Sequence, residues 1–186
     1  SAFNLEQYGL DMDESTSVLV DVIEAKASIE ETILAITPTL HLIPSSPYNA
    51  TLEGKIRDNF KNPTLAFRQI VDKLRTNYDF ILIDCSPALN LTNTAVISTS
   101  ELVIIPVEPS KFSKIGLNLT LKEIEQIEKD FNLKIDSRIV FTKFDQRQFI
   151  SMKYLGETAA EHPDKMFKTM IRTSTDVATA VAKKED

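Results

Sequence analysis

An uninterrupted apolar run that ends in a carboxylate constrains this chain more than any other feature of its sequence. Four consecutive large apolar residues, Phe80 to Ile83, are followed directly by Asp84. Such a run is typical of a strand that is buried on both faces, as in a parallel sheet. Open sheets of this kind bind ligands at the carboxyl ends of their strands. We therefore expect a buried parallel strand with Asp84 at a ligand-binding edge.

The position of Asp84 suits the coordination chemistry of magnesium. Mg²⁺ keeps several of its waters and takes few protein ligands, so one carboxylate can hold its water shell. The segment Asp79–Pro87 resembles the Walker B strand of a P-loop nucleotide hydrolase. Asp84 could also simply cap the turn that follows the strand. Many α/β proteins carry such a strand, so this run alone favours neither interpretation.

The phosphate-binding loop that accompanies a Walker B strand is not found in this sequence. Such a loop needs closely spaced glycines, whose backbone N–H groups cradle phosphate, and a lysine that reaches the outer phosphates. The four glycines are far apart in the sequence: Gly9, Gly54, Gly116 and Gly156. Either the protein does not bind nucleotide, or the loop lies upstream of Ser1. We favour the second hypothesis, because the chain opens without an initiator methionine.

Length, composition and charge exclude several classes of protein. We expect 186 residues with 42% hydrophobic content to form a single soluble domain over residues 1–186, and no apolar stretch approaches the length of a membrane span. The single cysteine, Cys85, excludes a disulfide framework, and we expect it in a buried turn. A net charge of −6 argues against a globally basic nucleic-acid binder. Residues 134–186 nevertheless hold ten Lys and Arg against eight Asp and Glu, which allows a local basic face.

Helical and strand patterns alternate along the chain. The helical spacing, together with a capping box at Ser28–Glu31, predicts helices over 18–23, 28–34, 62–74, 92–100, 113–130, 152–161 and 175–182. The apolar runs predict strands over 39–43, 80–84, 101–107, 137–142 and 166–171. This alternation predicts an α/β fold in three layers. Its doubly wound, mainly parallel sheet has right-handed crossovers and helices on both faces.

Several segments together resemble the ParA/Soj family of partition ATPases, within the MinD/ParA group of deviant P-loop proteins. The resemblance covers essentially the whole chain. It rests on Tyr78–Pro87 (with Ser86 where the family has proline), Asn93–Ala95, Ile105–Glu108 with the downstream Gly116-Leu117, Phe141–Arg147 and Phe167–Ile171. The family resemblance implies a P-loop NTPase-like fold whose first βα unit, with its Walker A loop, lies upstream of Ser1.

The resemblance implies ATP hydrolysis by the full-length protein, with ATP and Mg²⁺ as cofactors. Asp84 would hold the magnesium through water, and the other nucleotide-binding positions would be Pro87, Thr142, Asp145 and Arg172. For Thr142 and Asp145, a strand-end turn and a cap explain the residues equally well. No catalytic residue falls within residues 1–186, so we expect this part of the chain to be inactive by itself.

The resemblance also implies partners and a location. Family members form ATP-dependent homodimers, bind DNA without sequence preference, and work with a ParB-like partner protein. We expect a cytoplasmic, nucleoid-associated protein that does not bind membranes. The DNA-contacting residues would be Arg147, Lys143 and Lys153. Two alternatives stay open: a MinD-like positioning ATPase, and a non-catalytic α/β interaction module.

Overall fold

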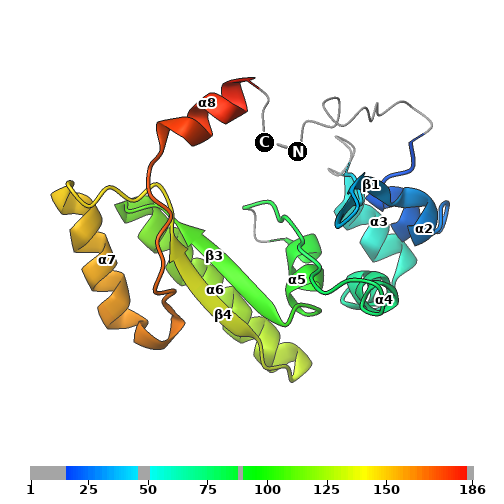
Figure 1. The fold of residues 1–186 in the computed structure, drawn as a ribbon. Helices are drawn as coiled ribbons and strands as arrows, with labels where there is room; N and C mark the ends of the chain where they lie inside the picture. The colour runs from blue at the N-terminus through cyan, green and yellow to red at the C-terminus, as the bar shows by residue number, and fades with distance from the viewer. Residues whose placement is uncertain (1–15, 46–50, 88–89, 184–186) are drawn as a thin grey trace. The chain divides into compact units, whose positions relative to one another are not determined.

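The computed structural model describes residues 16–45, 51–87 and 90–183, and its ribbon is shown in Figure 1. Internal contacts divide the chain into two compact units. Unit 1 comprises the chain up to Val96 together with the segment from Asp176 onward, and unit 2 comprises Ile97–Thr175. The prediction of a single domain over residues 1–186 stays a prediction.

Unit 1 contains short helices and one hairpin around an apolar cluster. Its elements are α1 (Leu19–Ile23), α2 (Ile29–Thr32), β1 (Leu34–Thr37), β2 (Leu40–Leu42), α3 (Leu52–Asn59), α4 (Leu65–Leu74), most of α5 (Leu91–Ile97) and most of α8 (Thr175–Lys183). The helix predicted over 62–74 is confirmed in α4 from Leu65 to Leu74, but its first three residues form a bend and a turn. Its buried residues are Ala66, Phe67, Ile70, Val71 and Leu74. All of these except Val71 pack in one cluster with Ile29 and Ile56.

The capping box at Ser28 forms as predicted, but the helix it opens ends early. The backbone N–H of Ser28 donates to the Glu31 carboxylate at 2.8 Å, and the N–H of Glu31 donates to Ser28 Oγ at 3.2 Å. Helix α2 ends at Thr32, and β1 begins at Leu34, so the helix predicted over 28–34 is wrong at its C-terminal end.

The strand predicted over 39–43 pairs differently from the prediction. Strand β2 forms an antiparallel hairpin with β1 rather than joining a parallel sheet. The turn explains this local pairing, because Thr37 Oγ1 accepts hydrogen bonds from the backbone N–H groups of Thr39 and Leu40. Such side-chain bonds stabilise a tight turn that closes a hairpin between neighbouring segments.

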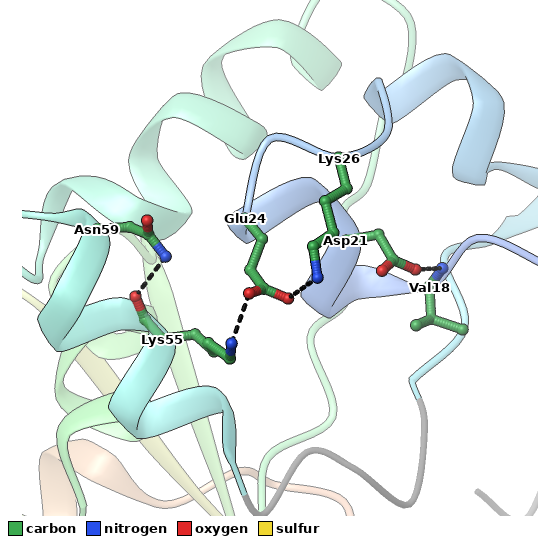
Figure 2. A network of polar contacts seen from close by, with 6 residues as sticks. All are labelled: Val18, Asp21, Glu24, Lys26, Lys55 and Asn59. Atoms are coloured by element: carbon green, nitrogen blue, oxygen red, sulfur yellow. Dashed lines mark hydrogen bonds and ion pairs between the residues drawn. The ribbon is translucent and has the colours of Figure 1, made fainter.

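A small polar network joins α1 to α3 in unit 1, as Figure 2 shows. Lys55 Nζ on α3 lies 2.6 Å from Glu24 Oε1, and Lys26 Nζ lies 3.0 Å from Glu24 Oε2. These two contacts lower the pKa of Glu24, while the carboxylate raises the pKa of Lys55. Asp21 accepts a hydrogen bond from the backbone N–H of Val18 at 2.8 Å and so caps the start of α1.

The buried strand predicted over 80–84 is not present in the structure. None of the residues 79–87 is assigned to a strand, and the side chains of Phe80 and Leu82 are 85% and 89% exposed. Ile81 and Ile83 pack against the unit 1 core. The physical reason is that burial on both faces requires neighbouring strands, and no strand of the described residues pairs with this segment. Alternate side chains of this segment therefore differ, because Ile81 and Ile83 are partly buried whereas Phe80 and Leu82 are exposed.

Unit 2 is built on a pair of parallel strands. Its elements are β3 (Leu102–Val107), α6 (Lys111–Phe131), β4 (Asp136–Phe141), α7 (Phe149–Glu161) and a 3₁₀ turn, η3 (Pro163–Lys165). The strands pair in register from Leu102 opposite Asp136 to Val107 opposite Phe141. Helix α6 lies along the pair (Figure 1) and buries four residues spaced for one face: Leu117, Leu121, Ile124 and Ile127. The predictions of strands over 101–107 and 137–142 and of a helix over 113–130 are confirmed.

The segment predicted as a strand over 166–171 follows β4 without becoming a regular strand. The N–H of Phe167 donates to the carbonyl of Ile139 at 2.9 Å, and the N–H of Ile171 donates to that of Phe141 at 2.8 Å. Only isolated parallel bridges form, at Met166 and Arg172. The predicted position is therefore confirmed, but the continuous strand is wrong.

We expect the β4 core to dominate the stability of unit 2. Ile139→Ala should lower the free energy of unfolding by about 2–5 kcal/mol, because Ile139 is fully buried and its truncation leaves a cavity. Ile104→Ala is the matched control, since this isoleucine lies on β3 and is 50% exposed. Its cost should be nearer 0.5 kcal/mol, roughly the range of surface substitutions. Thermal and urea unfolding followed by circular dichroism would measure both, and equal costs would contradict this account.

Candidate functional site

Asp84, at the end of the apolar run in unit 1, has an exposed carboxylate. Among the residues that the structure describes, no hydrogen bond or ion pair engages its side chain. Cys85 beside it is also exposed, so the prediction of a buried cysteine is wrong. This exposure follows from the lack of a paired strand beside segment 79–87 among the residues that the structure describes. Pro87 is exposed as well, at the last described position before residue 90.

The surroundings of Asp84 fit a water-mediated magnesium contact better than direct ligation by several side chains. In the described parts of the chain, no three His, Cys, Asp or Glu side chains gather closely enough to hold a metal ion. A single accessible carboxylate is the donor set that Mg²⁺ uses when it keeps most of its waters. The carbonyl of Ser86 accepts a hydrogen bond from Asn93 Nδ2 on α5 at 2.8 Å, which joins the segment's end to that helix.

A sharp turn after β4 positions the second group of predicted residues, in unit 2. The N–H of Thr142 donates to the carbonyl of Val107 at 2.9 Å and continues the β3–β4 pairing by one residue. Lys143 then adopts a left-handed backbone conformation with φ of 49°, which is costly for a residue with a side chain. This turn buries Phe144, which is 3% exposed, against Phe141 in an edge-to-face contact. The burial of Phe144 fixes where Asp145 emerges.

A hollow of about 440 Å³ lies beside this turn in unit 2. Its lining consists of residues 144–147 and 172–175, and we refer to it below as the 144–175 hollow. Two backbone hydrogen bonds join the two segments that line it. Phe144 N–H donates to Ile171 O at 3.1 Å, and Thr173 N–H donates to Phe144 O at 3.2 Å. The lining combines one carboxylate, two guanidinium groups and three hydroxyl groups, which can recognise a polar, anionic molecule.

The 144–175 hollow brings together some of the predicted nucleotide-binding residues but not all of them. Asp145 and Arg172 line it, whereas Thr142 does not. Arg147, predicted as a DNA contact, also lines it. Sequence reasoning did not assign the other lining residues: Phe144, Gln146, Thr173, Ser174 and Thr175. Only their position in the sequence could have indicated these residues. Both segments directly follow predicted strands, and the ends of parallel strands meet at one edge of a sheet.

Asp145 and Arg147 form a close ion pair in unit 2. Arg147 Nε donates to Asp145 Oδ1 and Arg147 Nη2 donates to Oδ2, both at 3.0 Å. The backbone N–H of Arg147 also donates to Oδ1 at 3.0 Å. The side-chain and then the backbone hydrogen bonds from Arg147 lower the pKa of Asp145 to about 2. The carboxylate is therefore charged throughout the physiological pH range.

The other two predicted DNA contacts also have acidic partners. Lys143 pairs with Glu108, and the two side chains are 71% and 51% exposed. Lys153 Nζ lies 3.9 Å from Glu157, a long contact. Glu157 bonds more closely to Lys114 of α6, at 2.9 Å. All three predicted cations are thus accessible, and each has a carboxylate beside it.

Comparison of the sequence with known proteins places the chain in a family. The AAA domain family matches residues 2–137. An uncharacterized protein of Methanocaldococcus jannaschii is 33% identical over 142 residues, which are 75% of this chain and 54% of that protein. The chromosome-partitioning ATPase Soj of Treponema pallidum is 27% identical over 154 residues, covering 81% of this chain and 60% of Soj. The chain thus spans less than two thirds of the length of these relatives.

A solved structure with the same fold is cobyrinic acid a,c-diamide synthase of Mycobacterium smegmatis, with bound ATP analog and magnesium. Its TM-score is 0.78 at 19% identity, over 96% of this chain and 73% of the synthase. This likeness confirms the predicted α/β fold class. In the described part of the chain, no helix is both long enough and apolar enough to cross a membrane. The chain belongs to the AAA domain family, within its ParA/Soj group.

Proposed function

We propose that the full-length protein is a ParA-type ATPase that acts in the partition of chromosome or plasmid DNA. The observation that carries this proposal is membership of the ParA/Soj group, in which the Soj relative is a chromosome-partitioning ATPase. The fold by itself does not carry it, because the structural neighbour with the same fold is a synthase. The proposal also requires a glycine–lysine phosphate loop in a part of the protein outside this sequence.

Each group of residues described above has its own proposed part in nucleotide chemistry. Phosphoryl transfer depends mainly on positioning and on stabilising the charge of the phosphates, which bound magnesium supplies. Asp84 would hold the water shell of that magnesium, supported by the exposure of its carboxylate. Pro87 would shape the turn after it. Asp145 and Arg172 would contact the nucleotide from the 144–175 hollow, and Thr142 would support the strand end beside it.

DNA binding would use the exposed cations of unit 2. Arg147, Lys143 and Lys153 would replace counterions along the phosphate backbone, which gives affinity without sequence preference. The exposure of the Arg147 side chain, 87%, supports this role. We further propose that ATP drives homodimerisation and that a ParB-like protein stimulates hydrolysis. The protein would then be cytoplasmic and associated with the nucleoid.

The first test compares two aspartates of the same segment in the full-length protein. Asp84→Asn should lower magnesium-dependent ATP hydrolysis on the order of 10- to 100-fold, the usual cost of disturbing a residue that positions a metal. Asp79→Asn is the matched control, since Asp79 is also exposed but lies at the other end of the apolar run, and its effect should stay within about twofold. Phosphate release at saturating ATP measures both. Equal rates for the two variants would remove Asp84 from the site.

Residues 1–186 produced alone provide a second test of the same proposal. The full-length protein should bind ATP, whereas this part should show no measurable binding, because the phosphate loop supplies most of the phosphate contacts. Isothermal titration calorimetry with ATP and Mg²⁺ measures this directly. Micromolar binding by residues 1–186 would contradict the need for an upstream loop. No binding by the full-length protein would favour the non-catalytic interaction module.

DNA binding is tested separately from nucleotide binding. Arg147→Ala in the full-length protein should weaken retention on duplex DNA of mixed sequence while ATP binding persists. The slope of log K against log salt should fall in magnitude by about 0.9, the value for one lost phosphate contact. Lys122→Ala removes one exposed positive charge from the middle of α6 and is the control. Unchanged DNA affinity at low salt for Arg147→Ala would exclude this contact.

A further inference from the structure

We propose that Asp145 sets the strength of the DNA contact made by Arg147, by holding the guanidinium on a carboxylate with which a DNA phosphate must compete. This inference rests on the proposed DNA-binding function and adds to it a residue that limits the affinity. Asp145 would be a positioning residue in this role, since it would act on DNA through Arg147 alone.

The geometry of the pair shows which partner is fixed and which can move. The Asp145 side chain is only 18% exposed, and the backbone N–H of Arg147 anchors its Oδ1 at 3.0 Å. The Arg147 side chain is 87% exposed, and its guanidinium meets the carboxylate through two parallel hydrogen bonds. The carboxylate is therefore part of the loop, whereas the guanidinium lies on the surface and can exchange partners.

A phosphate and a carboxylate compete for the same face of a guanidinium. Both anions accept two parallel N–H bonds from the planar fork, which makes Arg the usual residue at such sites. A phosphate that displaces Asp145 must break both bonds. A phosphate that binds the outer edge of the guanidinium instead lies close to a fixed negative charge. Either route makes the Arg147–phosphate contact weaker than the contact of an unpaired arginine.

Protonation cannot relieve this competition under ordinary conditions. With its pKa lowered to about 2, Asp145 keeps its charge at every pH at which DNA binding is measured. The exchange of Arg147 between carboxylate and phosphate is therefore a competition between two anions at all such pH values.

Lys143 and Lys153, the other two proposed DNA contacts, are restrained less by their carboxylate partners. The Lys143–Glu108 pair is exposed on both sides, and the Lys153–Glu157 contact is 3.9 Å long. Exposed pairs of this kind contribute little, because solvent screens them and both side chains lose conformational freedom. Of these three carboxylates, Asp145 combines two side-chain hydrogen bonds with the low exposure of 18%. The effect should therefore concentrate at this residue.

The test measures binding of the full-length protein to a mixed-sequence DNA duplex by fluorescence anisotropy, at saturating ATP and Mg²⁺. Asp145→Asn keeps the shape of the side chain and an oxygen that can accept the Arg147 backbone N–H, but removes the charge. It should tighten DNA binding about three- to tenfold, the scale of a well-formed ion pair near a surface. ATP affinity is measured for each variant, so that DNA binding is compared only at full occupancy of the nucleotide site.

Two controls separate a local effect from a general change of net charge. Asp164→Asn makes the same chemical change at an exposed position of η3 and should alter DNA affinity less than twofold. In an Arg147→Ala background, Asp145→Asn should give no gain, because the restrained guanidinium is gone. If Asp145→Asn fails to fold, Asp145→Ser serves as the second variant, since a serine hydroxyl can also accept the backbone N–H of this turn.

The outcomes distinguish this inference from the proposed function. A gain that disappears in the Arg147→Ala background supports the inference. An unchanged affinity for Asp145→Asn, or an equal gain in both backgrounds, overturns it while the DNA contact of Arg147 stands. If Arg147→Ala alone leaves DNA affinity unchanged, the proposed contact is wrong and the inference is overturned with it.

Discussion

The parallel pairing of β3 with β4 is the constraint on which the arrangement of unit 2 depends. Parallel strands cannot be joined by a tight turn, so the chain must cross back along the sheet, and α6 makes that crossing. The register that sets Val107 opposite Phe141 brings both strand ends to one edge. Glu108 and Lys143 follow those ends, and they form an ion pair there. The left-handed turn at Lys143 then places Phe144 in the core and Asp145 beside the 144–175 hollow.

The sequence predicted those elements whose causes are local. The face spacing of α6, the apolar runs of β3 and β4 and the capping box at Ser28 are properties of neighbouring residues, and the structure confirms them. The run from Phe80 to Ile83 has a pattern of equal strength. A strand is nevertheless defined by its partners, and none of the described strands pairs with these residues. The hairpin of β1 and β2 was missed for a related reason, because a two-residue turn decided the pairing against a parallel arrangement.

The candidate site was predictable as a set of positions and not as a set of interactions. Asp145 and Arg172 could be placed after strand ends, and they do line one hollow. Arg147 forms an ion pair with Asp145, two residues away. Composition could not predict this pair, because a net charge of −6 does not tell which cation contacts which carboxylate. The same reasoning allows an acidic chain to bind DNA. The affinity would depend on how readily a few accessible cations exchange their carboxylate partners for phosphates, and not on the net charge.

The exposed side chains of Phe80 and Leu82 also affect the chain while it is being synthesised at the ribosome. Ile81 and Ile83 pack against the core of unit 1, whereas Phe80 and Leu82 stay in contact with water. At a translation rate of about 5–20 residues per second, the hundred or so residues that follow take roughly 5–20 seconds to emerge. Phe80 and Leu82 are therefore exposed to water during that interval, as they are in the folded chain afterwards. Large apolar side chains exposed side by side favour association with other chains.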